Sequence, residues 1–178
     1  MSNVFFTSDM HFYHKNIIEY SSRPFESVED MNEKLISNWN NIVSKNDIVY
    51  DLGDFAFSNI ENIKGILKRL NGKHFFIYGN HDNVICKNKK TLLEEKLFLS
   101  IENYKSIKIN DKNIVLFHYG CRVWDKSFHG SWHLYGHSHG TLPPLGKSVD
   151  VGIDSKFIHN EYRPTSFDEI KKFMDNVE

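Results

Sequence analysis

Short apolar segments alternate with amphipathic segments through the first half of the chain. β-Branched and aromatic side chains predict strands at 3–8, 47–52 and 74–78, and apolar residues at helical spacing predict helices at 27–43 and 60–70. Strands that alternate with helices form a largely parallel sheet, because each parallel neighbour needs a crossover connection. Ligands of such sheets bind beyond the carboxyl ends of the strands. The alternation therefore predicts an α/β fold and the edge at which a functional site would lie.

The second half of the chain has a different pattern. A polar, Lys-rich stretch at 83–90 and a predicted helix at 92–98 precede two strands, 104–109 and 113–118, that flank the turn Asn110-Asp111-Lys112. Two more strands are predicted at 132–135 and 147–151, and a closing helix at 166–176 begins with a capping box of Ser166 and Glu169. We expect these strands to form a second sheet that packs on the first.

Length and composition narrow the class of protein. A chain of 178 residues fits one domain, 1–178, and no apolar run approaches the roughly 20 residues that span a bilayer. The formal charge of −1 gives no overall basic field for a polyanion such as long nucleic acid. Two cysteines provide no disulfide framework, and the first residues, MSNVFFTSDMHF, lack the build of a secretory signal. We therefore expect a cytoplasmic protein with no membrane partner.

Five short segments combine metal-binding side chains with turn residues, and each follows a predicted strand. They are Asp9-Met10-His11, Gly53-Asp54, Gly79-Asn80-His81-Asp82, His118 and Gly136-His137-Ser138-His139. Any one of them is more typical of a turn or a core histidine than of a ligand. Together they are hard to obtain by chance, and a divalent cation would satisfy many polar groups that are otherwise costly to bury. The joint pattern predicts a metal site at the strand ends.

The order of these motifs resembles that of the calcineurin-like metallophosphoesterases. The resemblance extends beyond the ligands to SDMHFYHKNII, RPF, NWN, LGDF, GNHD, HYG and LYGHSHG, which are similar to a small bacterial and phage-type branch of single-domain phosphoesterases. It implies a four-layer α/β/β/α sandwich of two mixed sheets flanked by helices. It also implies a centre of two divalent ions at the sheet edge.

Carried over residue by residue, the resemblance implies two sets of metal ligands that share Asp54. One ion would be held by Asp9, His11, Asp54 and His139, and the other by Asp54, Asn80, His118 and His137. Nitrogen and oxygen donors of this kind suit manganese, which we expect first, and also iron, zinc, nickel and cobalt.

The resemblance also implies a mechanism. A hydroxide that bridges the two metals would attack phosphorus, and His81 would assist the leaving group as the catalytic residue. Asn80 and His81 are the expected substrate-binding residues.

The sequence departs from the phosphoprotein phosphatases of this superfamily at two places. Those enzymes carry an aspartate three residues after the bridging one, where this chain has Phe57, and their arginine-rich phosphate clamp is absent after Asp54. The resemblance to protein phosphatases is therefore limited to the metal centre. Asp82 could support the metal ligands from behind, but a role in the turn and scaffold is favoured.

Other residues near the motifs have open or structural assignments. His14, Asn16 and Arg122 could each reach the substrate or simply serve their local segments. Structural or surface roles are favoured for His129, His133 and His159, and core positions rather than a base-stacking platform for Trp124, Phe128, Trp132 and Tyr135.

The leading functional hypothesis is a metal-dependent phosphoesterase, a hydrolase that acts on a small phosphodiester or a nucleotide-like substrate. Phosphomonoesterase and nuclease activity at the same centre remain alternatives. A non-catalytic scaffold of the same fold, like the retromer subunit, is disfavoured because all the ligand positions hold competent residues. The sequence makes no prediction about the oligomeric state.

Overall fold

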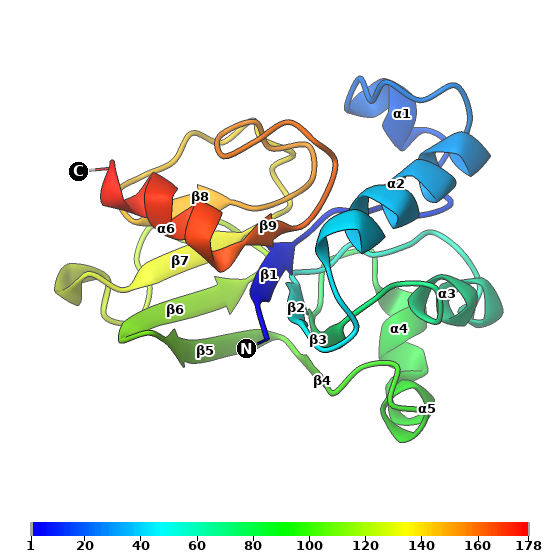
Figure 1. The fold of residues 1–178 in the computed structure, drawn as a ribbon, viewed down its shortest axis with the longest axis horizontal. Coiled ribbons are helices and arrows are strands. Elements are labelled where there is room, and N and C mark those ends of the chain that lie inside the picture. Colours follow the sequence, from blue (N-terminus) through cyan, green and yellow to red (C-terminus); the bar gives the residue numbers. More distant parts are fainter. Residues whose placement is uncertain (1, 178) are drawn as a thin grey trace.

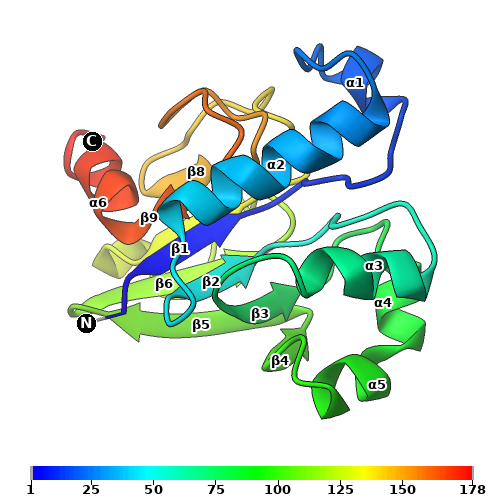
Figure 2. The ribbon, with the colours of Figure 1, turned by 45° about the vertical axis from the view of Figure 1, so that its right-hand side comes forward.

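The computed structural model describes residues 2–177, which form two mixed sheets with helices around them (Figures 1 and 2). The strands are β1 (Val4–Thr7), β2 (Ile48–Asp51), β3 (Lys73–Ile77), β4 (Ser100–Glu102), β5 (Tyr104–Ile109), β6 (Lys112–Phe117), β7 (Trp132–Tyr135), β8 (Ser148–Asp150) and β9 (Thr165–Ser166). The helices are α1 (Ile17–Tyr20), α2 (Val28–Ile42), α3 (Ile60–Leu67), α4 (Asn83–Lys87), α5 (Lys89–Glu94) and α6 (Phe167–Asp175), with a short 3-10 helix at Ser127–His129.

The first sheet has the strand order β4-β3-β2-β1-β9, in which only β9 runs antiparallel to its neighbour. The second has the order β5-β6-β7-β8, with one antiparallel pair, β5 and β6. The predicted parallel sheet, second sheet and hairpin are therefore confirmed. At the tip of the hairpin, Asn110 and Asp111 both have positive φ angles (44° and 66°), as the two central residues of a type I′ turn require.

Alternation along the strands divides the core into two clusters. Phe5, Val49 and Phe76 face helices α2 and α3, where they pack with side chains such as Trp39 and Ile63. Their neighbours Phe6, Tyr50 and Ile77 face the second sheet and meet Leu116 and Leu134 there. Helix α6 adds Phe167, Ile170 and Met174 to this second cluster. The two sheets flanked by helices agree with the sandwich that the sequence predicted.

Most predicted elements lie within a few residues of their observed bounds, but the segment after β3 differs. The polar stretch at 83–90, for which no helix was predicted, contains α4 and the start of α5. Helix α5 ends at Glu94, before the predicted bound of 98, because Lys96 adopts a left-handed backbone (φ 55°). Phe98 then enters the core from irregular chain. Among residues 2–177, no helix combines the length and the apolar character needed to cross a membrane.

The aromatic residues of the second half divide between core and surface. Trp132 and Tyr135 are buried, and Trp124 packs on the buried ring of His133 with the ring centroids 5.4 Å apart. The core position predicted for Phe128 is wrong, because this side chain is 90% exposed on the short 3-10 helix.

Candidate metal centre

The five motifs meet at one edge of the sandwich, because each begins within three residues of the end of a strand. Asp9 follows β1, Asp54 follows β2, and His118 directly follows β6. Asn80 and His81 follow β3, and the His137 segment follows β7. The structure therefore brings together the side chains that the sequence placed at strand ends.

The backbone of this edge is held in an unusual conformation. Asp9, His11, Asp54, His137 and His139 all have positive φ angles, between 47° and 65°, which non-glycine residues rarely adopt. Each costs roughly 1–3 kcal/mol and persists only where the surroundings enforce it. Such strain is concentrated at functional sites, and here it falls on residues predicted to hold metal.

Hydrogen bonds and two glycines enforce these turns. The amides of Asp9 and His11 donate to the carbonyl oxygens of Gly53 (2.9 Å) and Asp54 (3.0 Å), so the first two motifs hold each other. A Cβ at Gly79 would lie 2.2 Å from Asp54 Oδ1, and one at Gly136 would lie 2.4 Å from Asp9 Oδ2. Only glycine lets these loops approach the carboxylates so closely.

The structure contains two groups of side chains that could each hold a cation. The Asp9 group consists of Asp9, His11 and His139, and the His118 group of Asp54, His118 and His137. In the Asp9 group, Asp9 Oδ1 lies 3.9 Å from His11 Nε2 and 3.8 Å from His139 Nε2. In the His118 group, His118 Nε2 lies 3.0 Å from the side-chain oxygen of Asn80, which places that amide beside the same three residues.

One oxygen of Asp54 lies between the two groups. Asp54 Oδ2 is 3.8 Å from His11 Nε2 and 3.6 Å from His118 Nε2. The other oxygen, Oδ1, accepts a hydrogen bond of 2.8 Å from the backbone amide of His81. The His81 ring is half exposed, and its Nε2 lies 4.0 Å from Asp54 Oδ2.

Several atoms of the Asp9 group lack a partner although they are buried. Among residues 2–177, Asp9 Oδ1 and both ring nitrogens of His11 have no hydrogen-bond partner. Burial raises the pKa of Asp9 to about 8 and lowers that of His11 to about 2, because each charged form is cut off from water. Unpartnered buried groups of this kind are costly unless a ligand satisfies them. A divalent cation fits, since it accepts lone pairs from both a carboxylate and a neutral imidazole.

His139 and His118 are oriented from behind by groups that leave Nε2 directed at the site. Asp154 Oδ2 lies 2.6 Å from His139 Nδ1, and the carbonyl oxygen of Leu52 lies 2.7 Å from His118 Nδ1. Burial alone would lower the pKa of His139, but the Asp154 carboxylate raises it above its ordinary value. Partners of this kind fix the tautomer and the direction of a metal-ligating histidine.

Asp154 also anchors Arg23, and sequence reasoning missed both residues. The Arg23 guanidinium donates to both Asp154 oxygens (2.9 and 2.8 Å) and to the carbonyl oxygens of Met10 and Asp9. Asp154 is a single carboxylate with no neighbouring motif, so only its place in the fold reveals its role. The RPF segment that contains Arg23 did contribute to the family resemblance.

Two further carboxylates hold the loops of the site. Asp82 accepts hydrogen bonds from the amides of Asp54 (2.7 Å), Phe55 (3.1 Å) and Gly79 (2.7 Å), which agrees with the favoured scaffold role. Asp150, which the sequence analysis did not single out, accepts from Ser138 Oγ (2.5 Å) and from the amide of Gly140 (2.9 Å). It thereby holds the loop that carries His137 and His139.

A cavity of about 560 Å³ opens beside the Asp9 group and is called the His81 cavity here. Its lining residues are His11, His14, Ile17, Tyr20, Ser21, Phe57, His81, Ser138, His139 and Thr141. Of the open candidates, His14 therefore lies at the site. Asn16 is exposed and lines no described part of this cavity, and Arg122 lines a different one, with Tyr135 and Leu142.

The remaining histidines lie elsewhere in the fold, as expected. His133 is buried, with Nε2 accepting from the amide of Cys121 (3.1 Å), and His159 Nε2 lies 2.8 Å from Thr165 Oγ1. His129 is exposed. Cys86 and Cys121 are both free.

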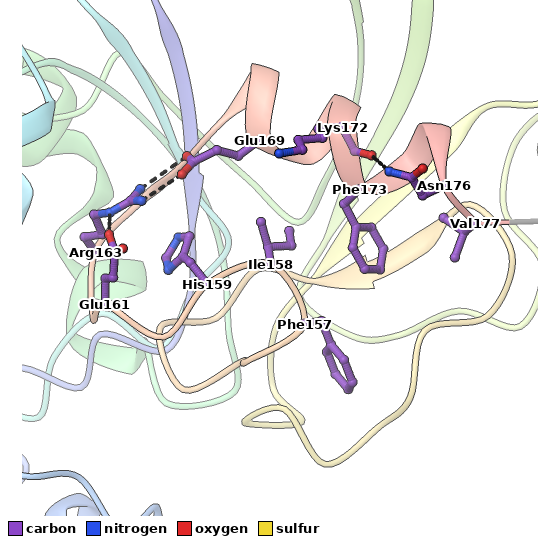
Figure 3. A pocket seen from close by; sticks show the side chains of 10 residues that line it. All are labelled: Phe157, Ile158, His159, Glu161, Arg163, Glu169, Lys172, Phe173, Asn176 and Val177. Atoms are coloured by element: carbon purple, nitrogen blue, oxygen red, sulfur yellow. Dashed lines mark hydrogen bonds and ion pairs between the residues drawn. The ribbon is translucent and has the colours of Figure 1, made fainter.

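A second cavity, of about 480 Å³, lies along α6 and is called the α6 cavity (Figure 3). At one end Arg163 is paired with Glu161 and Glu169, and at the other Phe157, Phe173 and Val177 form an apolar wall. The guanidinium donates to Glu169 at 2.7 and 3.2 Å. With Lys172, the lining of this cavity carries two positive and two negative side chains.

Comparisons with known proteins place the chain in a family. The model of the calcineurin-like phosphoesterase family matches residues 2–170. An uncharacterised protein of Methanocaldococcus jannaschii is 35% identical over 184 residues, which cover 98% of this chain and 93% of that protein.

Two solved structures show the same fold. A protein of unknown function from Aquifex aeolicus superposes with a TM-score of 0.72 and 25% identity, covering 97% of this chain and 99% of that one. An archaeal phosphodiesterase superposes with a TM-score of 0.53 and 20% identity, covering 86% and 84%. Since the family model spans nearly the whole chain and two candidate metal-binding groups lie at its strand ends, the protein belongs to the calcineurin-like phosphoesterase family and is a metal-dependent phosphoesterase.

Proposed function

We propose that the protein uses two divalent cations to hydrolyse a small phosphodiester, such as a nucleotide-like molecule. The observation that carries this proposal is the position of Asp54 Oδ2. This oxygen lies within 4.0 Å of imidazole nitrogens from His11, His118 and His81. A carboxylate there can serve two cations at once and sits beside a third, exposed imidazole that is free to meet the substrate.

The proposed ligands divide around that carboxylate. Asp9, His11, Asp54 and His139 hold one cation, and Asp54, Asn80, His118 and His137 hold the other. The two candidate groups and the unpartnered atoms of Asp9 and His11 support this division. The mixture of oxygen and nitrogen donors suits manganese, iron, zinc, nickel and cobalt, and manganese is the first to test.

Cations bound here would supply a hydroxide near neutral pH and hold the phosphoryl oxygens. The chain itself supplies His81, whose half-exposed ring stands beside the shared carboxylate while its backbone amide is tied to Asp54 Oδ1. We assign His81 the role of donating a proton to the leaving oxygen, and Asn80 with His81 the role of contacting the phosphoryl group.

A diester is favoured over a monoester because the site has room for a second ester group. The His81 cavity, about 560 Å³, is of the size that binds small molecules and adjoins the proposed proton donor. A protein phosphatase is disfavoured because Phe57 stands where those enzymes have an aspartate, and its ring packs on His81 with the centroids 4.8 Å apart.

The experiment is a comparison of wild type and His81→Ala, each stripped of metal and reloaded with manganese, nickel, cobalt or zinc. The substrates are p-nitrophenyl phosphate, its bis-ester, cyclic nucleotides, and single- and double-stranded DNA. We expect metal-restored turnover of the bis-ester that the variant loses. Preference for the monoester would make the protein a phosphatase, and preference for DNA a nuclease. The absence of turnover with every metal and every substrate would contradict the proposal.

A further inference from the structure

The chemistry of the His81 cavity points to the kind of group that the substrate carries. This inference rests on the proposed function, because it concerns the ester group that lies next to His81. The cavity is lined by the segment after β1, including α1, by Phe57, and by the loop of Ser138 and Thr141. His81, His11 and His139 line the end nearest the candidate metal groups.

The lining of this cavity contains no fixed charge. Among its described lining residues there is no lysine, arginine, aspartate or glutamate. Arg23 lies near the site, but its guanidinium is fully buried, forms an ion pair with Asp154 and donates hydrogen bonds to backbone carbonyl oxygens. Away from the end next to the candidate metal groups, a second phosphate or a carboxylate on the substrate would thus lose water without gaining a fixed positive charge. The cavity therefore favours an ester group that is neutral.

Aromatic side chains line the same cavity and leave apolar ring surface exposed to water. The rings of Phe57 and His14 are stacked, with centroids 3.9 Å apart and planes 19° apart, and the ring of Tyr20 lies at 77° to that of His14 with the centroids 6.2 Å apart. Phe57 is 38% exposed and Tyr20 is 72% exposed, although both are large and apolar. Ile17 adds an aliphatic contact. A planar ring bound here would cover surface that otherwise faces water.

We propose that the His81 cavity is a subsite for a neutral aromatic or heteroaromatic group on the alcohol that leaves, and that Phe57 and Tyr20 select it. Hydrolysis forms a bond from phosphorus to a water oxygen and breaks the bond to the ester oxygen beside His81. That oxygen receives a proton from His81, which is reprotonated from solvent, and the water that supplies the attacking oxygen releases its proton to solvent. The products are a ring-bearing alcohol and a phosphomonoester.

Phosphonates test the subsite without the complication that phenols are better leaving groups than alkyl alcohols. Benzylphosphonate, ethylphosphonate and 2-carboxyethylphosphonate are titrated calorimetrically into the manganese-loaded protein, and turnover of bis(p-nitrophenyl) phosphate is measured in parallel. We expect benzylphosphonate to bind about tenfold more tightly than ethylphosphonate, the scale of aromatic stacking on a protein surface. The carboxyethyl compound should bind most weakly.

The matched variants are Phe57→Leu and Tyr20→Ala, with Phe128→Leu as the control at an exposed aromatic outside the cavity. The first two should reduce the preference for the benzyl over the ethyl compound to about threefold or less, and the control should leave it unchanged. Equal affinities in the wild type, or a preference that survives both variants, would overturn the subsite while turnover leaves the proposed function intact. No binding of any phosphonate together with no turnover would instead overturn the proposed function, and this inference with it.

Discussion

Two regions of this protein, the α6 cavity and the strand ends beside the His81 cavity, show opposite ways of treating charge. In the α6 cavity, Arg163 is paired with Glu161 and Glu169, and Glu169 also accepts from the backbone amide of Ser166 in a capping box. At the strand ends, Asp9 and His11 are buried with polar atoms that form no hydrogen bond within the described part of the chain. The guanidinium and the carboxylates of the α6 cavity have partners within the protein and contribute stability. The polar atoms at the strand ends need a ligand as their partner, and we therefore assign function to that edge.

The largest expected effect is at the carboxylate between the two candidate groups. Asp54→Asn should lower the affinity for both cations together, by more than about 100-fold. Substituting a residue that only orients a ligand costs up to about 100-fold in metal affinity, and removing a ligand should cost more. Metal content by mass spectrometry and turnover by the bis-ester assay check this. Glu169→Gln, a matched change in the α6 cavity, should leave both readings unaltered. Loss of one cation with the other retained would contradict the shared ligand.

His81→Ala separates chemistry from metal binding within the same edge. If His81 donates a proton to the leaving oxygen, turnover should fall roughly 10²- to 10⁴-fold, while two cations remain bound. The ring is half exposed, so its removal should disturb the fold little. The measurement pairs kcat with metal content. A variant that loses metal would show that His81 is a ligand.

Asp154→Asn tests whether the support behind the site matters. The amide keeps an oxygen near Arg23 and His139 but removes the charge that both contact. Metal affinity should fall by about 10- to 100-fold, and the free energy of unfolding should also fall, because the buried guanidinium loses its counter-charge. Metal titration and urea unfolding measure the two effects. Affinity equal to wild type would mean that His139 is oriented without Asp154.

Glu169→Gln should have the smallest effect, and it should appear in stability alone. Burial raises the pKa of Glu169, but hydrogen bonds from Arg163 and Ser166 outweigh it and hold that pKa at about 2, below the ordinary 4.5. The contribution is therefore present above pH 4.5 and is lost as the pH falls from 4.5 towards 2. Because water partly screens this carboxylate, we expect a loss of about 1 kcal/mol at pH 7.

Urea unfolding at pH 7 and pH 2.5 measures that difference between Glu169→Gln and wild type. Asp168→Asn, an exposed change in the same first turn, is the control. A loss of stability that is equal at both pH values would contradict the ion pair as its source.

Much of the fold could be predicted from the sequence because local sequence patterns agree with the tertiary structure. The capping box of Ser166 and Glu169 starts α6 where predicted, and the spacing of Met31, Leu35 and Trp39 marks the buried face of α2. Strands β4 and β9 were not predicted, because three and two residues are too short for any alternation to show. Helix α4 was missed because it buries a single side chain, Ile85, and α5 was expected at 92–98 instead of Lys89–Glu94 because it too buries only one, Leu92.

The candidate site could be predicted from the sequence for a different reason. Most of its motifs combine two or more polar residues at a strand end, so the amino-acid sequence alone predicts that Asp9, Asp54 and His118 lie at one edge. The groups that orient them are single residues with no local signature. Asp150 ends β8 and Asp154 follows it in what looks like an ordinary turn, while Arg23 reaches the site from a segment far from any strand end. Their roles come from long-range contacts, which the sequence pattern does not contain.

The most direct measurement is a crystal structure of the protein loaded with manganese, with the ions located by anomalous scattering. We expect two peaks about 3.5–4 Å apart, one on each side of Asp54, with no peak in the α6 cavity. A single peak, or two peaks that do not share Asp54, would contradict the claim that this carboxylate joins the two halves of the site.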